Sequence, residues 1–339
     1  DYEMNFVKRS SILGAVVLLV GLMVLSACVG SYPISPGEIL RILLGNGGDT
    51  MEVRVFWQLR LPRVLMGVMA GGVMSLSGAV YQTIFCNPLA SPDLTGVASG
   101  ASLGAACAIV LGTGSAVQLM VGAFATGMLS VVLVLLLVRF SRFRQMSSYI
   151  LAGIVVSSVA DAGLMCLKVM ADPEGELAAI EFWTMGSLGA ITAGKLFPNL
   201  LVMAVPFVLL LLFHRQAVML SLGEEHARSM GLNPSLWRGI FLTLSTLMIA
   251  GLVSVTGVIS FVGLIGPHIA FWLHKRRGKG YFLLSSAVGA VLVLTADMLA
   301  RSLWKGAELP LSIFTVFLAV PVLILLPRGR KGDFHGTAA

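Results

Sequence analysis

Residues 221–234 read SLGEEHARSMGLNP, a charged stretch that separates two apolar runs, each long enough to cross a membrane. A bilayer core is about 30 Å thick, so a spanning helix needs roughly 20 apolar residues. Runs of that length recur along the whole chain, in which 57% of the 339 residues are hydrophobic and 12% are charged. Soluble domains carry about a quarter charged residues. The stretch therefore joins two membrane helices of a polytopic protein.

The apolar runs are continuous rather than alternating, which favours helices over the strands of a membrane barrel. We expect an all-α membrane bundle of about ten transmembrane helices, forming a single domain over residues 1–339 with no separate soluble domain. The ten predicted segments cover about 11–30, 62–85, 93–112, 116–139, 147–170, 195–214, 236–257, 259–274, 281–302 and 310–327.

Lysine and arginine residues predict the orientation, because the cytoplasmic loops of membrane proteins are enriched in them. With both termini in the cytoplasm, the loop at 171–181 lies outside and is acidic, whereas the outer loop at 31–63 carries four arginines. The net charge of +7 then reflects topology and does not imply a nucleic-acid partner. The basic residues assigned to the cytoplasmic side are Lys8, Arg9, Arg139, Arg142, Arg144, Arg215, Arg228, Lys275, Arg276, Arg277, Lys279, Arg328, Arg330 and Lys331.

Two short sequence patterns are similar to motifs that have other functions. LSAC at 25–28 follows an apolar run and is similar to the end of a lipoprotein signal. Because the run reaches Gly30 and ten helices with both ends inside require it, we expect an uncleaved first helix. GAITAGKL at 189–196 is close to a phosphate-binding loop, but Leu196 stands where that loop needs a serine or threonine for magnesium. We interpret it as the start of a helix.

Small residues recur every four positions in two of the segments. Lipid offers no hydrophobic drive between helices, so close approach of backbones holds them together. We therefore expect these two faces to pack against other helices rather than to bind a substrate. The faces contain Gly67, Gly71, Ser75 and Gly78 in one segment, and Gly96, Gly100, Gly104, Ala108 and Gly112 in the next.

The opening stretch predicts a short helix with both ends specified. Ser221 and Glu224 form the S-x-x-E pattern of a capping box, and Gly231 is placed as a C-terminal glycine cap. Asn233 and Pro234 then start the next membrane helix. A helix of about eight residues is too short to be stable alone. We expect it to gain order by contact with a partner. Ala227 and Met230 lie on one face of the helix, which could pack into a groove of that partner.

Several motifs occur together in a fixed order: LRLPRVLMGVMAGG (59–72), NPLASPDLTGVASGA (87–101), SLGEEHARSMGLNP, GVISFVGLIGPHIA (257–270), ADMLAR (296–301) and ELP (308–310). In these motifs the chain resembles the FecCD-like family, the permease subunits of type II ABC importers for iron-siderophores, haem and cobalamin. The resemblance covers about residues 59–321. The chain departs from the family pattern at Val258, Ser260, Phe271, Ser312 and Ala319.

The resemblance implies a partnership in the bacterial inner membrane. Two permease subunits, identical or paralogous, pair around a central pathway, and a periplasmic binding protein delivers a metal chelate from outside. A pair of ATP-binding subunits docks below and carries ATP and magnesium, so this chain is expected to bind no cofactor or metal and to have no catalytic residue. The family's coupling helix, about 221–232, matches Gly223, Glu224, Glu225, Ala227, Arg228, Met230 and Gly231.

The resemblance also gives a role to three arginines on the outer side. Arg60 and Arg63 match the family's R-L-P-R, and Arg301 ends its A-D-x-x-x-R motif. In the family these arginines accept glutamates of the binding protein, which suits the rigid two-pronged guanidinium. The alternative is that they are anchors that snorkel to the membrane surface.

Ionisable groups inside a membrane are costly and are functional by default. Asp161, Met165 and Lys168 share a face of one helix, which in the family helps to line the pathway. A structural hydrogen bond is the alternative for Asp161. Asp297 is expected to orient neighbouring helices, and Pro267 and His268 match a family motif that is structural or part of a gate.

Two other function classes compete with an ABC permease. The first is an ion- or proton-coupled secondary transporter in which Asp161 and Asp297 relay the ion. The second is a membrane scaffold without transport, which gives no reason for a capped charged helix beside outward arginines.

Overall fold

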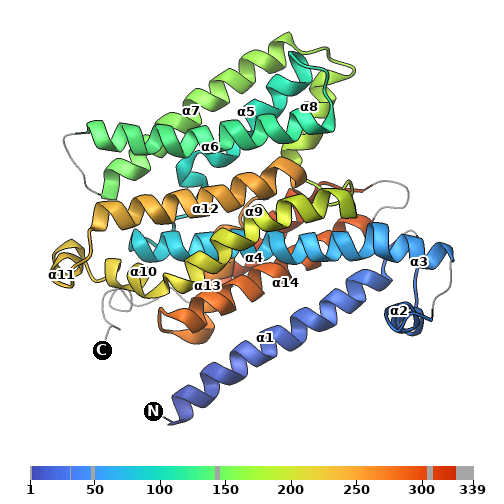
Figure 1. Ribbon diagram of the computed structural model, residues 1–339, viewed down its shortest axis with the longest axis horizontal. Coiled ribbons are helices and arrows are strands. Elements are labelled where there is room, and N and C mark those ends of the chain that lie inside the picture. Colours follow the sequence, from blue (N-terminus) through green and yellow to red (C-terminus); the bar gives the residue numbers. More distant parts are fainter. Residues whose placement is uncertain (1, 31, 47–49, 142–145, 304–307, 326–339) are drawn as a thin grey trace.

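The computed structural model describes residues 2–30, 32–46, 50–141, 146–303 and 308–325, and every regular element in these ranges is helical. Figure 1 shows the helices running roughly side by side in one bundle. In chain order they are α1 (Tyr2–Cys28), α2 (Pro36–Leu43), α3 (Met51–Val55), the π-helix η1 (Phe56–Arg60), α4 (Leu61–Ile84), the 3₁₀ helix η2 (Pro92–Thr95), α5 (Val97–Val110), α6 (Ala116–Phe140), α7 (Met146–Met170), α8 (Glu176–Met185), α9 (Ala193–Leu212), α10 (His214–Leu220), α11 (Glu224–Ser229), α12 (Pro234–Thr256), α13 (Val262–His274), α14 (Lys279–Ser302) and α15 (Leu311–Leu325).

The ten predicted apolar segments each coincide with one helix, which confirms the all-α membrane bundle. They correspond to α1, α4, α5, α6, α7, α9, α12, α13, α14 and α15. Seven candidate spans are long and apolar enough to cross a membrane, and α5, α13 and α15 are shorter apolar helices. The π-helix η1 extends α4 on its outer side, so that helix is continuous over 34 residues from Met51 to Ile84.

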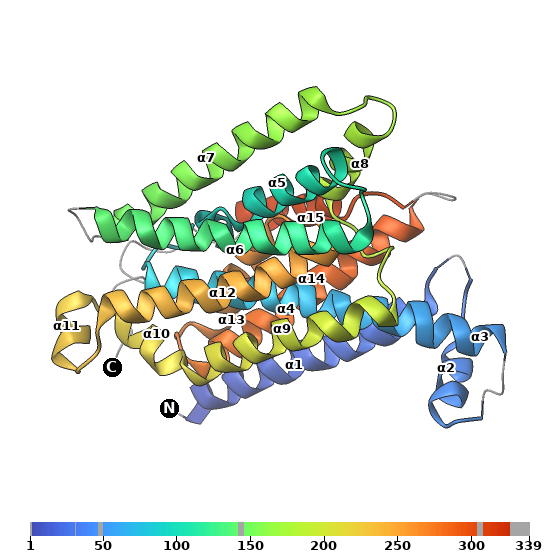
Figure 2. The ribbon, with the colours of Figure 1, turned by 45° about the horizontal axis from the view of Figure 1, so that its top comes forward.

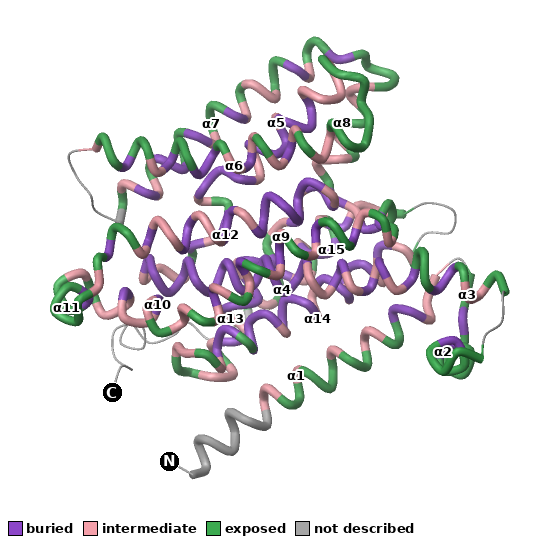
Figure 3. The backbone as a smooth tube through the Cα atoms, viewed as in Figure 1, coloured by how far each residue is buried: buried purple, intermediate pink, exposed green. Residues whose placement is uncertain are grey.

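The centre of the bundle is the contact between α4 and α14. The apolar part of the α4 span is 83% buried, far more than any other span, and Figure 3 shows the same concentration of buried residues. Gly71 and Gly289 face each other so closely that a Cβ added to either would overlap the backbone of the other. Beside them the Ser75 hydroxyl donates to the Ser285 carbonyl at 2.6 Å. The predicted small-residue face of α4 is therefore a packing face.

The second small-residue face lies on α5 and packs against α6. A Cβ at Gly104 would overlap the backbone of Gly122, and one at Gly100 would overlap the Ser130 hydroxyl. Gly96 ends η2 in the left-handed conformation, with φ of 69°, which suits a residue without a Cβ. Small residues thus allow the two helix backbones to approach each other, as expected for helices in lipid.

Two helices lie on opposite sides of the bundle and remain largely uncovered. The apolar parts of α1 and α7 are only 11% and 28% buried, and Figure 2 shows the two helices separated by the rest of the bundle. α1 is a continuous helix through Cys28, and its retention as an uncleaved first helix stays a prediction. Each of these two helices presents most of its apolar surface to lipid or to another protein.

Some short helices lie where the sequence predicts only loops. The loop at 31–63 contains α2, α3 and η1, and the acidic loop at 171–181 leads into α8. α2 begins with a complete capping box, in which the Ser35 hydroxyl accepts from the Glu38 N–H and the Glu38 carboxylate accepts from the Ser35 N–H. The hydrogen bond from the Ser35 backbone lowers the pKa of the Glu38 carboxyl below its ordinary value. The predicted loop at 189–196 does enter a helix, α9, at Ala193.

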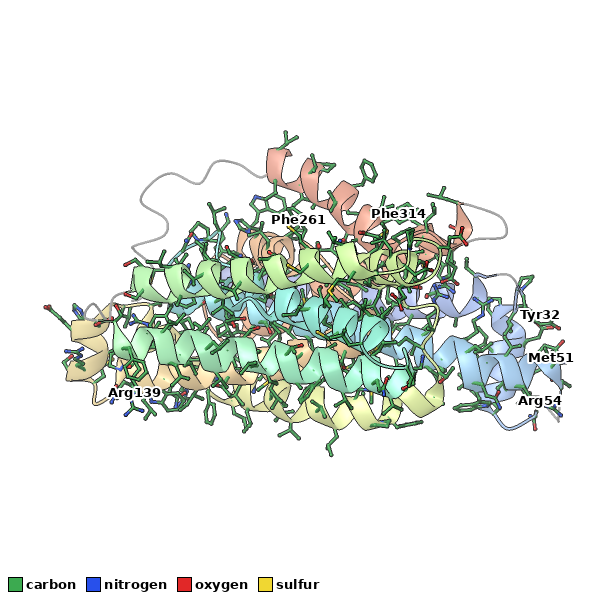
Figure 4. All side chains as sticks on the ribbon, turned by 90° about the horizontal axis from the view of Figure 1, so that it is seen from above. Tyr32, Met51, Arg54, Arg139, Phe261 and Phe314 are labelled. Carbon is green, nitrogen blue, oxygen red and sulfur yellow. The ribbon has the colours of Figure 1, made fainter. Side chains whose placement is uncertain are left out.

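The two ends of the bundle carry different short helices, and the charge-based orientation assigns one of these ends to the cytoplasm. α10 and α11 lie at one end, whereas α2, α3 and α8 lie at the other (Figure 1). Figure 4 shows Arg139 at the α11 end, and Tyr32, Met51 and Arg54 at the opposite end. We refer to the α11 end as cytoplasmic. Five basic residues used for the orientation lie outside the described residues: Arg142, Arg144, Arg328, Arg330 and Lys331. The side chains of Lys8 and Arg9 are likewise outside the described part of the chain.

Candidate functional site

The short helix at the cytoplasmic end, α11, starts differently from the prediction. Its N-cap is Gly223, with φ of 103° and no side-chain cap, so the capping box of Ser221 and Glu224 does not form. Ser221 follows the last residue of α10, and its hydroxyl donates back to the Val218 carbonyl at 2.6 Å. The helix has six residues rather than about eight.

The end of α11 agrees with the prediction. Gly231 adopts a left-handed conformation with φ of 82°. Its N–H donates to the Arg228 carbonyl at 2.9 Å, and the Leu232 N–H donates to the Ala227 carbonyl at 2.9 Å. These two bonds form a Schellman motif. The Asn233 side chain then accepts from the Leu236 N–H and caps α12, with Pro234 in its first turn. Residues 230–233 therefore turn the chain from α11 into the membrane.

A charge pair joins α11 to the base of α12. The Glu224 carboxylate accepts from Arg238 Nη1 at 2.5 Å and lies 3.6 Å from Arg228 one turn further along α11. Arg238 is 3% exposed and Glu224 is 38% exposed. Removing Glu224, which is partly open to water, would leave the buried Arg238 guanidinium without a compensating charge, and this is destabilising. The pair therefore fixes α11 relative to a membrane helix.

Ala227 and Met230 of α11 differ in burial, which the sequence did not predict. Ala227 is fully buried in the main hydrophobic cluster of this chain, whereas Met230 is 51% exposed. The prediction that both side chains face a partner is wrong for Ala227, because its methyl group packs against its own bundle. Gly223, Glu225 and Arg228 are exposed at the same end. Contact of α11 with an ATP-binding subunit stays a prediction that these exposed residues allow.

At the outer end, two arginines hold the C-terminus of α1. Arg301 donates to the carbonyls of Ser26 and Val29 at 2.8 and 2.7 Å, and Arg60 donates to those of Val29 and Tyr32. The last carbonyls of a helix have no partner within the helix and carry partial negative charge. Arg60 and Arg301 are 8% and 3% exposed, so they link α1 to α4 and α14 from inside the bundle.

Arg63 completes this outer cluster. Its guanidinium donates to both carboxylate oxygens of Asp297, with the shortest separation 2.9 Å, and to Glu308 at 2.6 Å. Asp297 also pairs with Arg301 at 3.3 Å and is 2% exposed, whereas Glu308 is 39% exposed. Asp297 thus joins neighbouring helices, in line with its expected orienting role. Docking of a binding protein by Arg60, Arg63 and Arg301 stays a prediction, and all three already have partners within the chain.

The three pathway candidates lie on the uncovered helix α7. Asp161 is half-buried, and in the described part of the chain its carboxylate has no hydrogen-bond or ion-pair partner. Met165 is 66% exposed. Lys168 pairs with Glu181 of α8 at 2.8 Å, on the outer side. The structure brings these residues to one helix and leaves their predicted role in a pathway untested.

The motif GVISFVGLIGPHIA forms the loop before α13 and most of that helix. His268 Nδ1 lies 2.7 Å from the Leu264 carbonyl, and Gln82 of α4 donates to the same carbonyl at 3.1 Å. Pro267 is buried within α13. Three of the residues that depart from the family pattern also pack here: the Ser312 hydroxyl donates to the Val258 carbonyl at 2.9 Å, and Arg277 lies over the Phe271 ring.

Sequence reasoning missed three residues of these clusters: Arg238, Glu308 and Tyr149. Glu308 stood in a quoted motif without a role, and Arg238 is the one arginine in the apolar stretch after Pro234. A charge inside a membrane segment is itself a signal that a partner exists. Tyr149 carries no such signal, and only the structure places it near α11 and α12.

The fold and these clusters define a polytopic membrane permease with a short capped helix at its cytoplasmic end. The model of the FecCD transport family matches residues 18–328, so the chain belongs to that family. The vitamin B12 import system permease protein BtuC of Klebsiella pneumoniae is 31% identical over 332 residues, which cover 95% of this chain and 96% of that protein. The Fe(3+)-citrate import system permease protein YfmE of Bacillus subtilis is 33% identical, covering 93% of this chain and 94% of that protein.

A solved structure gives the same answer for the fold. An ABC transporter in an inward-facing conformation, described as of the metal-chelate type, superposes with a TM-score of 0.82 and 32% sequence identity. The match covers 94% of this chain and 98% of the other. This chain is therefore an ABC transporter permease subunit and a multi-pass protein of the cytoplasmic membrane.

Proposed function

We propose that this chain is the membrane permease subunit of a binding-protein-dependent ABC importer that translocates a metal chelate with ATP hydrolysed by a separate subunit. The observation that carries the proposal is α11, a short helix at the cytoplasmic end that is stopped at Gly231 and fixed to α12 by Glu224 and Arg238. A rigidly anchored helix can transmit force to the membrane helices, whereas a flexible loop cannot.

The proposal includes a pair of ATP-binding subunits below the permease. The exposed side of α11, with Glu225, Arg228 and Met230, supports docking of such a subunit at this end. ATP and magnesium would be bound by that partner rather than by this chain. Family membership supports the division of labour, since the relatives are permease subunits.

A second permease subunit, either a copy of this chain or a paralogue, is the next part of the proposal. The uncovered face of α7 supports it, because Val159, Met165 and Val169 are 68%, 66% and 88% exposed on one membrane helix. A pathway between two subunits would then pass along α7, with Asp161 inside the membrane. The periplasmic binding protein would dock at the opposite end from α11.

The class of cargo follows from the relatives and stays part of the proposal. One relative imports vitamin B12 and another imports Fe(3+)-citrate, and both are about equally similar to this chain. We therefore propose an organic metal chelate, with iron-siderophores, haem and cobalamin as the candidates to assay.

The test is transport by the purified assembly. The chain is isolated from native membranes, its co-purifying ATP-binding subunit is identified, and the complex is placed in proteoliposomes with the binding protein and labelled chelates. We expect uptake that requires ATP and stops when the ATP-binding subunit carries an inactivated phosphate loop. Ala227→Phe should abolish uptake, because the buried site has no room for the ring. Uptake that persists without any ATP-binding subunit would contradict the proposal.

The alternative of an ion- or proton-coupled transporter rests on one observation. Asp161 has no charged partner within the described residues, as a relay group would require. Asp297, the other candidate relay, is already held in ion pairs with Arg63 and Arg301. Collapse of uptake by an ionophore at constant ATP would favour this alternative.

A further inference from the structure

A hollow of about 470 Å³ lies at the cytoplasmic end, between the start of α7 and the junction of α11 with α12. It is lined by Tyr149, Glu224, Arg228 and Arg238, together with residues 231–235. Two guanidinium groups and one carboxylate face it, while the other lining residues are neutral, so the hollow carries a net positive charge. Hollows of this size hold small ligands or single anchoring side chains.

The lining offers more hydrogen-bond donors than acceptors. The Arg238 side chain is 3% exposed and uses Nη1 for Glu224, and among the described residues its Nη2 has no hydrogen-bond partner. The Tyr149 side chain is 5% exposed and packs on Phe85, and its hydroxyl has no hydrogen-bond partner among the described residues. Arg228 is 69% exposed at the rim and touches Glu224 only at 3.6 Å. Donors of the lining that lack a protein partner can be satisfied by an acceptor that enters the hollow.

The mouth of the hollow opens to water rather than to lipid. In Figure 1, α11 projects beyond the ends of α6, α7 and α12. The residues at the rim, Arg228, Asn233 and Ser235, are exposed and polar. An occupant reaching the hollow from this side comes from the cytoplasm.

We propose that this hollow receives an acidic side chain of the ATP-binding subunit, whose carboxylate pairs with Arg228 and accepts from the free donors of Arg238 and Tyr149. The inference rests on the proposed function and adds the chemistry of one docking contact to it. A carboxylate matches the two-pronged geometry of a guanidinium, and charge-assisted bonds of this kind are about twice as strong as neutral ones. The contact would tie the partner to α7 and α12 as well as to α11.

A zero-length cross-link tests the contact directly. Arg228→Lys keeps the charge at an exposed position and supplies an amine that a carbodiimide couples to a carboxylate within bonding distance. The variant is purified as the complex with its ATP-binding subunit, treated with carbodiimide and digested. We expect mass spectrometry to find residue 228 joined to an aspartate or glutamate of that subunit. Arg215→Lys, the same change at an exposed position of α10 outside the hollow, is the matched control and should give no such peptide.

A binding measurement gives the second readout. Arg228→Gln should weaken association of the permease with the ATP-binding subunit by roughly tenfold, as expected for loss of one charge-assisted contact. Arg215→Gln should change it less than twofold. Inorganic phosphate, added to the permease alone, should leave its unfolding temperature equal to that in chloride at the same ionic strength.

The outcomes separate the two proposals. If the wild-type chain co-purifies with no ATP-binding subunit, the proposed function fails. If the complex forms but residue 228 gives no cross-link and Arg228→Gln binds as tightly as the wild type, the acidic contact is wrong. Stabilisation by phosphate that Arg228→Gln abolishes would instead make the hollow a free-anion site and would overturn the inference.

Discussion

Arg63 and Asp297 lie 234 residues apart in the sequence, yet their side chains meet at 2.9 Å between α4 and α14. On each helix the pair lies eight residues nearer the outer end than the contact of Gly71 with Gly289, and Asp297 is 2% exposed. Arg301 and Glu308 join the same cluster. Asp297 therefore pairs with two arginines, one of which, Arg63, also pairs with Glu308.

Asp297→Asn should destabilise the protein by about 3–5 kcal/mol, the usual cost of leaving a buried charge without its partner. Arg301 loses its ion-pair partner in this variant, and among the described residues Arg63 keeps only Glu308. The measurement is the free energy or midpoint of unfolding in detergent. Glu308→Gln is the graded comparison, because Glu308 is 39% exposed and water screens its pair with Arg63. Its cost should be about 1 kcal/mol or less, and an equal loss in both variants would contradict this account of the cluster.

Gly71→Ala should separate α4 from α14. The added methyl group would overlap the Gly289 backbone, which cannot move away as a flexible side chain can. We expect a loss of about 1–3 kcal/mol, the usual cost of overpacking, and a lower unfolding midpoint in detergent. Gly21→Ala in α1 is the control, since no atom of the described residues lies within 4 Å of a Cβ there. A Gly71→Ala protein as stable as the Gly21→Ala protein would show that the helices tolerate separation.

The bundle could be predicted because its signals are local. The length of an apolar run and the four-residue spacing of Gly67, Gly71 and Ser75 are read within one helix, and the structure confirms both. α2 could also have been predicted from the sequence, since residues 35–38 read S-P-G-E, a complete capping box with proline in the first turn. A search restricted to long apolar runs passes over so short a helix.

The clusters at the two ends could be predicted only in part. The pattern at Ser221 and Glu224 fits a capping box, but it does not reveal that α10 runs up to Ser221 and uses its hydroxyl. Glu224 instead finds Arg238, which lies in the next membrane helix. The outer arginines were expected to face a partner. In the structure they instead bind acceptors at Ser26, Val29 and Glu308, which come from distant parts of the chain. Spacing within one segment carries no information on such contacts.

Removing an arginine from the outer cluster should release the end of α1. Arg301 donates to the carbonyls of Ser26 and Val29 and also pairs with Asp297. A lysine in its place has one compact ammonium group, which cannot reach all three partners. Arg301→Lys should therefore speed amide hydrogen exchange in the last turn of α1, with little change in α4. Arg41→Lys, an exposed change on α2, is the control. Unchanged protection at the end of α1 would mean that apolar packing alone holds it.

Glu224→Gln should uncouple ATP hydrolysis from transport. The variant loses the charge that joins α11 to α12, so movement of the ATP-binding subunit would no longer be passed efficiently to the membrane helices. We expect the assembled complex to hydrolyse ATP while uptake per ATP falls severalfold, measured in proteoliposomes with both rates in the same sample. Glu174→Gln, an exposed change in the outer loop, should leave the ratio unchanged. The double variant Glu224→Arg with Arg238→Glu exchanges the two charges and so restores an ion pair. Partial recovery of uptake per ATP in this variant would show that the ion pair causes the loss in Glu224→Gln. A ratio equal to that of the wild type in Glu224→Gln would show that α11 transmits force without this anchor.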